Sequence, residues 1–148
     1  MRRLEKYLIF QNFCEQLATL STCKRAKCAA IVFDWRFERV VSIGYNGPAR
    51  HLANEACTAV PKACGCIHAE ANALLKARTA QDVGGYAMYS TTYPCPHCAG
   101  LILNSGIVSV LFWRTEYTDM SDWYKDSKIL VINANDDDKV RWALETIK

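Results

Sequence analysis

Two short segments, each at the start of an expected helix, carry the side chains that most restrict how this chain can fold. The first is His68-Ala69-Glu70, and the second is Pro94-Cys95-Pro96-His97-Cys98. Cys95 and Cys98 are three residues apart, so both sulfur atoms face the same way in the first turn of a helix. With His68 they offer three ligands for one metal ion, and a fold that binds it must bring the two segments together.

The number of ligands indicates what such a metal ion would do. A structural zinc ion takes four protein ligands, whereas a hydrolytic one takes three and leaves a position for water. A helix N-terminus also stabilises thiolates through its free N–H groups and its dipole. Glu70 can lie beside the metal without binding it, take up a proton, and pass it to a substrate ring nitrogen and then to the leaving group. In the alternative interpretation Cys95 and Cys98 only staple a loop, and His97 is expected on the helix surface in either case.

The spacing of apolar residues predicts helices that alternate with strands. Helices are expected at about 4–20, 67–77, 96–104 and 136–147, and strands at 28–33, 39–45, 86–92, 108–113 and 129–132. Turn signals at Asn46-Gly47-Pro48 and Ser105-Gly106 separate several of these elements. The order predicts a layered α/β domain with a partly parallel sheet, and 148 residues suit a single domain spanning residues 1–148.

Composition narrows the function classes. The chain is 51% hydrophobic and 22% charged, which is ordinary for a globular protein. A net charge of +3 is too small to indicate nucleic-acid binding by itself, and no apolar run approaches the roughly 20 residues of a membrane span. The first residues lack the features of a signal peptide, so we expect a cytoplasmic protein without a membrane partner. In a reducing cytosol, eight cysteines favour metal ligands or buried thiols over disulfides.

The arrangement H-x-E…P-C-x-x-C resembles the signature of the zinc-dependent cytidine deaminase superfamily. Two segments, Gly44-Tyr45-Asn46-Gly47 and the helix start from His68 to Ala73, are similar to the deoxycytidylate (dCMP) deaminases within it. The similarity extends over about residues 20–118. It implies a three-layer α/β/α fold around a central mixed five-stranded sheet. It also implies one catalytic zinc ion and assigns its ligands and the proton carrier to His68, Cys95, Cys98 and Glu70.

The resemblance implies hydrolysis of dCMP to dUMP and ammonia, which would supply dUMP for thymidylate synthesis. By this resemblance Asn46 contacts the deoxyribose, the backbone around Ala69 and the strand end from Thr91 to Pro94 hold the pyrimidine, and Tyr117 closes over the base or sugar. Independently, the substrate phosphate needs a cation or N–H donors. Arg25 and Arg50 are the preferred candidates; the others are Arg114 and Lys125, and any of these charges could equally belong to a solvated surface.

The resemblance also implies regulation. Family members are commonly homohexamers that dCTP activates and dTTP inhibits, with Mg²⁺ accompanying the triphosphate. The Gly-Tyr-Asn-Gly turn borders that regulatory site in the family. We therefore assign four residues to regulatory nucleotide binding: Tyr45, Asn46, Gly47 and Asn72.

A second group of cysteines lies between that turn and His68. It comprises Cys57, Cys64 and Cys66, with His51 just upstream. Some dCMP deaminases bind an additional structural zinc ion in this region, but the residues here do not reproduce one fixed pattern. Two interpretations stay open, a second zinc site or a set of buried reduced thiols.

Rival functions share parts of this pattern. A zinc deaminase could act on another cytosine nucleotide or nucleoside, or on a base within RNA or DNA, and the last would need a basic, aromatic surface. The four tryptophans are dispersed and no dense run of Lys or Arg is present, so no stable nucleic-acid partner is expected. A non-catalytic zinc module would instead show a fourth protein ligand on the metal.

Overall fold

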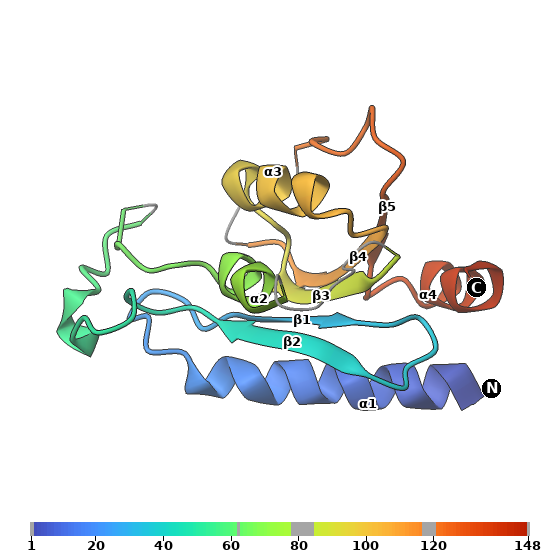
Figure 1. Ribbon diagram of the computed structural model, residues 1–148, viewed down its shortest axis with the longest axis horizontal. Coiled ribbons are helices and arrows are strands. Elements are labelled where there is room, and N and C mark those ends of the chain that lie inside the picture. The colour runs from blue at the N-terminus through green and yellow to red at the C-terminus, as the bar shows by residue number, and fades with distance from the viewer. Residues whose placement is uncertain (1, 62, 78–84, 117–120, 148) are drawn as a thin grey trace.

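A five-stranded mixed sheet forms the middle layer of the protein (Figure 1). The computed structural model describes residues 2–61, 63–77, 85–116 and 121–147. The strands lie in the order β2 (Val40–Tyr45), β1 (Ala29–Phe33), β3 (Ala87–Thr92), β4 (Ser109–Arg114) and β5 (Leu130–Asn133). Strand β1 is antiparallel to both of its neighbours, whereas β3, β4 and β5 are parallel. The predicted mixed five-stranded sheet is therefore confirmed.

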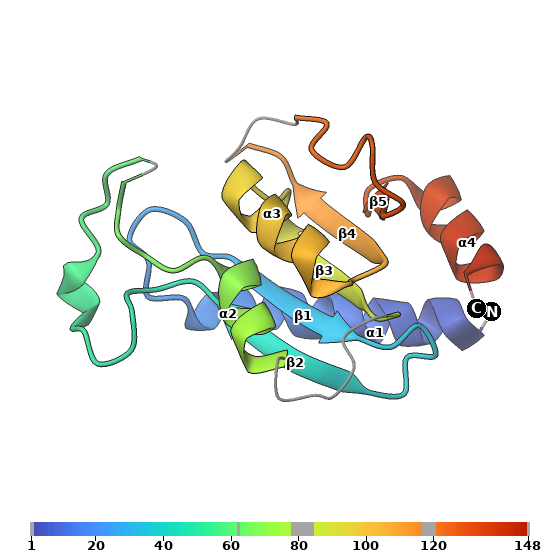
Figure 2. The same ribbon diagram turned by 45° about the horizontal axis from the view of Figure 1, so that its top comes forward.

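Helices cover both faces of the sheet (Figures 1 and 2). Helix α1 (Arg2–Leu17), continued by a 3₁₀ turn (Ala18–Leu20), packs with α4 (Asp137–Thr146) on one face. Helices α2 (Ala69–Ala77) and α3 (Pro96–Ser105) pack on the other. This arrangement confirms the three-layer α/β/α fold. Among the described residues, no helix has both the length and the apolar character needed to cross a lipid bilayer.

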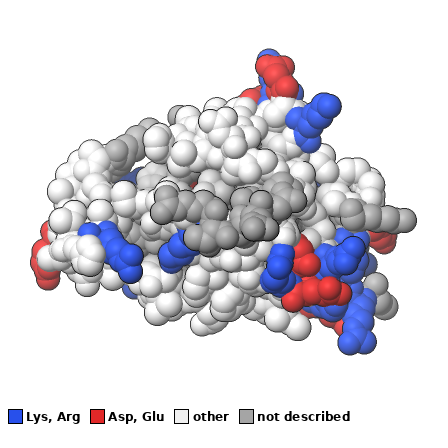
Figure 3. All heavy atoms as spheres, viewed as in Figure 1, with Lys and Arg blue, Asp and Glu red and all other residues white. Residues whose placement is uncertain are grey.

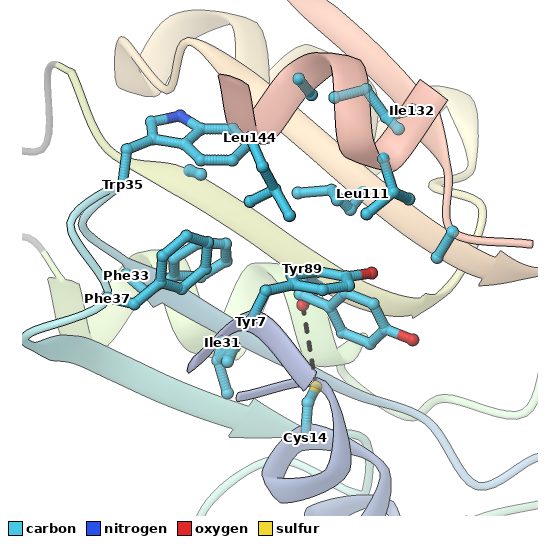
Figure 4. Close-up of a cluster of buried hydrophobic side chains, with 14 of the residues drawn as sticks. Tyr7, Cys14, Ile31, Phe33, Trp35, Phe37, Tyr89, Leu111, Ile132 and Leu144 are labelled. Atoms are coloured by element: carbon cyan, nitrogen blue, oxygen red, sulfur yellow. Dashed lines mark hydrogen bonds between the residues drawn. The ribbon is translucent and has the colours of Figure 1, made fainter. Parts of the chain in front are cut away.

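The two faces of the sheet are packed differently. Bulky aromatic side chains fill the space between α1 and the sheet, where the rings of Phe33 and Phe37 stack at 5.3 Å and Tyr7 meets Tyr89 edge to face (Figure 4). On the opposite face the sheet packs against the buried alanines Ala69, Ala73 and Ala77 of α2. Small residues let α2 lie close to the sheet, which places its N-terminus against the strand ends.

Gly44 makes that close approach possible. A Cβ atom at this position would lie 2.4 Å from the Ala69 carbonyl oxygen and 2.5 Å from the Ala73 amide nitrogen. Only a residue without a side chain fits between β2 and the first turn of α2. The first glycine of the Gly-Tyr-Asn-Gly turn therefore has a structural role in positioning the helix that starts after His68.

The ends of several strands meet at one edge of the sheet. Ala29 pairs with Tyr45, and Thr92 pairs with Arg114, so β2, β3 and β4 end beside the start of β1. The connections that follow these strand ends supply both segments singled out in the sequence. The loop between β2 and α2 extends outward from this edge (Figure 1).

Candidate metal centre and adjoining cavity

Three side chains from two helix starts converge at this edge. His68 directly precedes α2, Cys95 is the N-cap of α3, and Cys98 lies in the first turn of α3. The Nδ1 atom of His68 is 3.4 Å from the sulfur of Cys95 and 3.4 Å from that of Cys98. A tetrahedral zinc ion with Zn–N near 2.0 Å and Zn–S near 2.3 Å separates such ligand atoms by roughly 3.5 Å. The donor set and its spacing therefore fit one zinc ion.

The helix start prepares the sulfur atoms for metal binding. Pro96 occupies the first turn of α3, and the Cys95 sulfur accepts the backbone N–H of Cys98 at 3.5 Å. Hydrogen bonds from Cys98 and then from His68 lower the pKa of the Cys95 thiol. The hydrogen bond with Cys95 likewise raises the pKa of His68, against the opposing effect of burial. The mutual hydrogen bond of the two thiols raises the pKa of Cys98, so Cys95 is the more acidic thiol of the pair.

Glu70 lies next to these ligands without joining them. It is buried in the first turn of α2, and its Oε1 atom accepts a hydrogen bond from the Ser90 hydroxyl at 3.0 Å. Burial raises the pKa of Glu70, although contacts with Cys98 and His68 act in the opposite direction. Among the described residues, no fourth His, Cys, Asp or Glu joins the three ligands. The site thus offers three ligands, an open position and a neighbouring carboxyl group.

An open cavity of about 70 Å³ adjoins the metal ligands. Its walls come from the α1–β1 connection, the end of β2, the start of α2 and the end of β3. The lining residues are Arg25, Ala26, Cys28, Asn46, His68, Ala69, Glu70, Thr92, Tyr93 and Cys95. One cation, one aromatic ring and several polar groups therefore surround the position beside Glu70.

Asn46 joins two walls of the cavity. Its side-chain Nδ2 donates to the Ala26 carbonyl at 2.7 Å, and its Oδ1 accepts from the Cys28 amide at 2.8 Å. The Ser21 hydroxyl also donates to Oδ1. The amide oxygen is thus committed to the α1–β1 connection, and one Nδ2 hydrogen remains for a ligand.

Several residues predicted to bind substrate lie at the cavity, and others do not. Arg25, Asn46 and Ala69 line it. The Thr91 hydroxyl instead accepts from the Ala29 amide at 3.0 Å, and the buried Pro94 does not line the cavity; Thr92 and Tyr93 line it in their place. Arg50 and Lys125 are exposed, and Tyr117 lies outside the described residues. Thr92 and Tyr93 belong to the strand end from Thr91 to Pro94 that the sequence analysis assigned to the pyrimidine. It did not identify Ala26 or Cys28, whose types give no local signal.

Arg114 has protein partners rather than a place in the cavity wall. Its Nη1 atom donates to the Lys27 carbonyl at 3.0 Å, and its Nη2 atom lies 3.8 Å from a Glu15 carboxylate oxygen. Glu15 also accepts a hydrogen bond from Tyr89. Arg114 therefore attaches the α1–β1 connection to the end of β4 and to α1.

The turn assigned to regulation is held by backbone contacts. Gly47 and Ile67 exchange two backbone hydrogen bonds, of 3.3 and 2.7 Å. The Asn72 side chain donates to the Tyr45 carbonyl at 2.9 Å, and the Lys76 ammonium lies 5.7 Å from the centre of the Tyr45 ring. The turn is therefore attached directly to α2, the helix that carries Glu70.

Four cysteines form a second cluster beyond the edge of the sheet. Cys57, Cys64 and Cys66 are joined by Cys23, and all four sulfur atoms lie within 4.8 Å of one another. Cys23 is 3.9 Å from both Cys57 and Cys64, near the roughly 3.8 Å expected between sulfur atoms of a tetrahedral zinc site. His51, which the sequence analysis placed near this group, is not part of it. The pKa of the Cys57 thiol is lowered to about 6, chiefly by the hydrogen bond from the Lys24 amide.

The three-layer α/β/α fold carries a three-ligand site that fits one zinc ion. Residues 4–114 match the model of the cytidine and deoxycytidylate deaminase zinc-binding region, and the chain belongs to this family.

Similar proteins support this placement. The chain is 40% identical over 101 residues to deoxycytidylate deaminase of Mus musculus. The match covers 61% of this chain and 51% of the mouse protein. It is 36% identical over 118 residues to deoxycytidylate deaminase of Mycobacterium phage D29, covering 70% of this chain and 90% of the phage protein. The dCMP deaminase of cyanophage S-TIM5, solved with dCMP and dUMP, has a TM-score of 0.73, 26% identity, and coverage of 87% of this chain and 96% of that one. The chain spans about half the length of the mammalian relatives it matches.

Proposed function

We propose that this protein hydrolyses dCMP to dUMP and ammonia. The observation that carries the proposal is the meeting of three metal ligands, an open fourth position and Glu70 at the mouth of a cavity that also holds Arg25. The names of the phage and mammalian relatives support the choice of substrate.

In this reaction the cytosine C4–N bond breaks and a C4–O bond forms. His68, Cys95 and Cys98 would hold the zinc ion, which when bound lowers the pKa of a water molecule and so supplies a nucleophile. Glu70 takes one proton from the attacking water and delivers it to ring atom N3. It then takes the second proton from the new C4 hydroxyl group and passes it to the amino group, which leaves as ammonia when the C4–N bond breaks. Burial raises the pKa of Glu70, which suits a group that must both accept and release a proton near neutral pH.

Arg25 is the cavity residue best suited to the substrate phosphate. It is half-buried in the cavity wall, and an arginine presents several N–H donors that match a phosphate. Arg50 is exposed on the outer loop and Arg114 is engaged by Lys27 and Glu15, so neither competes with Arg25 in the described cavity.

A substitution at Glu70 tests the mechanism. Glu70→Gln should retain fold and zinc content but lower kcat for dCMP at least ~10²-fold, the usual scale for a general acid–base residue. His97→Gln is the matched control, because His97 is exposed on α3 between two ligands and outside the ligand set. Near-normal turnover by Glu70→Gln would refute the mechanism.

The substrate is tested with a panel of free cytosine nucleosides and nucleotides and a tRNA. We expect dCMP to be turned over with the highest kcat/KM, because the cavity offers Arg25 to a phosphate. Preferred turnover of cytidine, or tight salt-dependent binding of tRNA, would favour the rival deaminases. On the face seen in Figure 3, basic side chains are scattered among acidic and neutral ones, without a continuous basic patch for nucleic acid.

We further propose that the four-cysteine cluster binds a structural zinc ion. Four thiols with this spacing complete a tetrahedral set, unlike the three-ligand centre. Purified protein should contain two zinc ions per chain, and Cys64→Ser should reduce this to one while dCMP turnover is retained. Cys14→Ala is the control, since Cys14 is buried against Tyr89 and belongs to neither set. One zinc ion per chain in the wild-type protein would refute the second site.

Regulation, assembly and location extend the proposal. We expect a cytoplasmic homohexamer activated by dCTP and inhibited by dTTP, with Mg²⁺ bound to the triphosphate, and with dUMP used for thymidylate synthesis. The contact of Tyr45 with Asn72 in α2, and that of Gly47 with Ile67 just before α2, offer a path from the turn to Glu70. Saturation by dCMP should be sigmoidal and become hyperbolic with dCTP and Mg²⁺. Hyperbolic curves insensitive to both triphosphates would contradict this part.

A further inference from the structure

Ser90 is a fully buried serine in the central strand β3, and its hydroxyl lies against the Glu70 carboxyl group. The Oγ atom is 3.0 Å from Oε1 of Glu70 and 2.8 Å from the carbonyl oxygen of Thr92. The Thr92 amide points back at the same Oγ atom from 3.4 Å. One hydroxyl hydrogen thus has two candidate acceptors, and the oxygen has a donor of its own.

The carboxylate is the stronger of the two acceptors. A hydrogen bond to an ionised oxygen is shorter and roughly twice as strong as one to a neutral carbonyl. The Ser90 oxygen accepts a hydrogen bond from the Thr92 amide, which leaves the hydroxyl hydrogen of Ser90 free to be donated to Glu70. Since Glu70 is buried and no described cation pairs with it, this contact is one of few that can fix its orientation.

The contact engages one of the two carboxylate oxygens. Ser90 approaches Glu70 from the sheet, whereas the cavity and the ligands His68 and Cys95 lie at the open edge. A hydrogen bond from the sheet side therefore sets the plane of the carboxyl group while the group still lines the cavity. Proton transfer by a misoriented carboxylate is slow even when substrate binds normally.

We propose that Ser90 is a positioning residue for the proposed deamination and holds Glu70 in its proton-transfer orientation. This inference rests on the proposed function. It assigns to β3 a role beyond sheet formation, because the hydroxyl that serves Glu70 belongs to the middle of a strand rather than to either metal-binding segment.

Ser109 shows that a fully buried serine hydroxyl in this sheet can lack a hydrogen-bond partner. It lies on the adjacent strand β4, is as fully buried as Ser90, and its Oγ atom has no hydrogen-bond partner among the described residues. The comparison separates a serine that only fills space from one that contacts the carboxyl group. Ser109→Ala is therefore the matched control for Ser90→Ala.

The first experiment compares kcat and KM for dCMP in the two variants. Ser90→Ala should lower kcat about tenfold to a hundredfold, the range expected from a lost hydrogen bond to a charged group, with KM and zinc content unchanged. Ser109→Ala should leave kcat within twofold of wild type. Ser90→Thr keeps the hydroxyl and should recover most of the lost kcat. A kcat within twofold of wild type in Ser90→Ala, or equal losses in both alanine variants, would overturn the proposal.

A double-mutant cycle asks whether Ser90 acts through Glu70. In a Glu70→Gln background, Ser90→Ala should lower kcat by much less than it does alone, because the group it orients no longer transfers protons. Additive losses would overturn the positioning role.

Thermal unfolding of the metal-free proteins provides a readout that does not depend on turnover. If Ser90 contacts Glu70, the Tm changes of the two single variants should not add in the double variant, and additive changes would overturn the contact. A wild-type protein that turns over no cytosine nucleotide would refute the proposed function, and the Tm cycle would still decide whether Ser90 holds Glu70.

Discussion

Replacing Gly44 with alanine should move helix α2 away from the sheet and reduce both stability and turnover. The added Cβ would lie 2.4 Å from the Ala69 carbonyl oxygen and 2.5 Å from the Ala73 amide nitrogen. Both are backbone atoms, so no side chain can rotate out of the way. The helix as a whole, or the end of β2, has to yield.

The size of the effect follows from these distances. Ordinary contact begins near 3.4 Å, so the backbones must separate by about 1 Å. Overpacking of this kind costs about 1–3 kcal/mol of unfolding free energy. The same movement displaces Glu70, one residue beyond Ala69, and a misplacement of about 1 Å can lower kcat by about 10²-fold.

Gly100→Ala provides the control in the other helix that contributes metal ligands. A Cβ at Gly100 would meet no atom within 4 Å, and the position lies inside α3. Alanine there should be neutral or stabilise by up to about 1 kcal/mol, because glycine is a poor helix former. Thermal unfolding and dCMP turnover measured on both variants test the reasoning. A Gly44→Ala protein with the Tm and kcat of wild type would refute it.

Two further predictions concern protonation and the cavity wall. The hydrogen bond with Cys95 raises the pKa of His68 in the metal-free protein. In the metal-free protein the resulting stabilisation is fully present below the unfolded-state pKa of His68 and is lost as pH rises through its raised folded-state pKa. In the metal-bound protein acidification should instead release the metal and lower stability. Calorimetry of the metal-free and metal-bound proteins across pH should show these opposite trends. Arg114→Ala removes the hydrogen bond to Lys27 and a partly exposed ion pair worth less than about 1 kcal/mol. It should therefore raise KM for dCMP while kcat and Tm change little, and an unchanged KM would contradict the role given to Arg114.

Local signals in the sequence were sufficient to predict the elements and the meeting of the three candidate ligands. The run Ala29–Phe33 is wholly buried, as expected for a central strand. The Pro-Cys-Pro start of α3 places Cys95 at the N-cap and Cys98 one turn later, so the spacing of the two sulfurs follows from helix geometry alone. His68 joins them because β2 and β3 end at the same edge of the sheet.

The parts that could not be predicted depend on the packing of distant segments. Cys23 lies in the α1–β1 connection and completes the second cluster from 34 positions before Cys57, a proximity that no local pattern encodes. The choice between Arg25 and Arg50 depends likewise on which loop folds over the strand ends. The contact between Ser90 and Glu70 requires the register of β3 against α2, which alternating burial does not reveal in a strand buried on both faces.

The α1–β1 connection links the two cysteine-containing sites. Cys23 belongs to the outer cluster, the Lys24 amide donates to Cys57 at 3.3 Å, and Arg25 lines the cavity. The Cys28 amide then closes the connection onto Asn46 at 2.8 Å. Because Arg25 lies only two residues from Cys23, a metal ion in the outer cluster would restrain the residue proposed to bind phosphate without touching Glu70. Loss of that metal should therefore weaken dCMP binding more than it slows the chemical step, which assigns the outer cluster to substrate affinity and the inner centre to turnover.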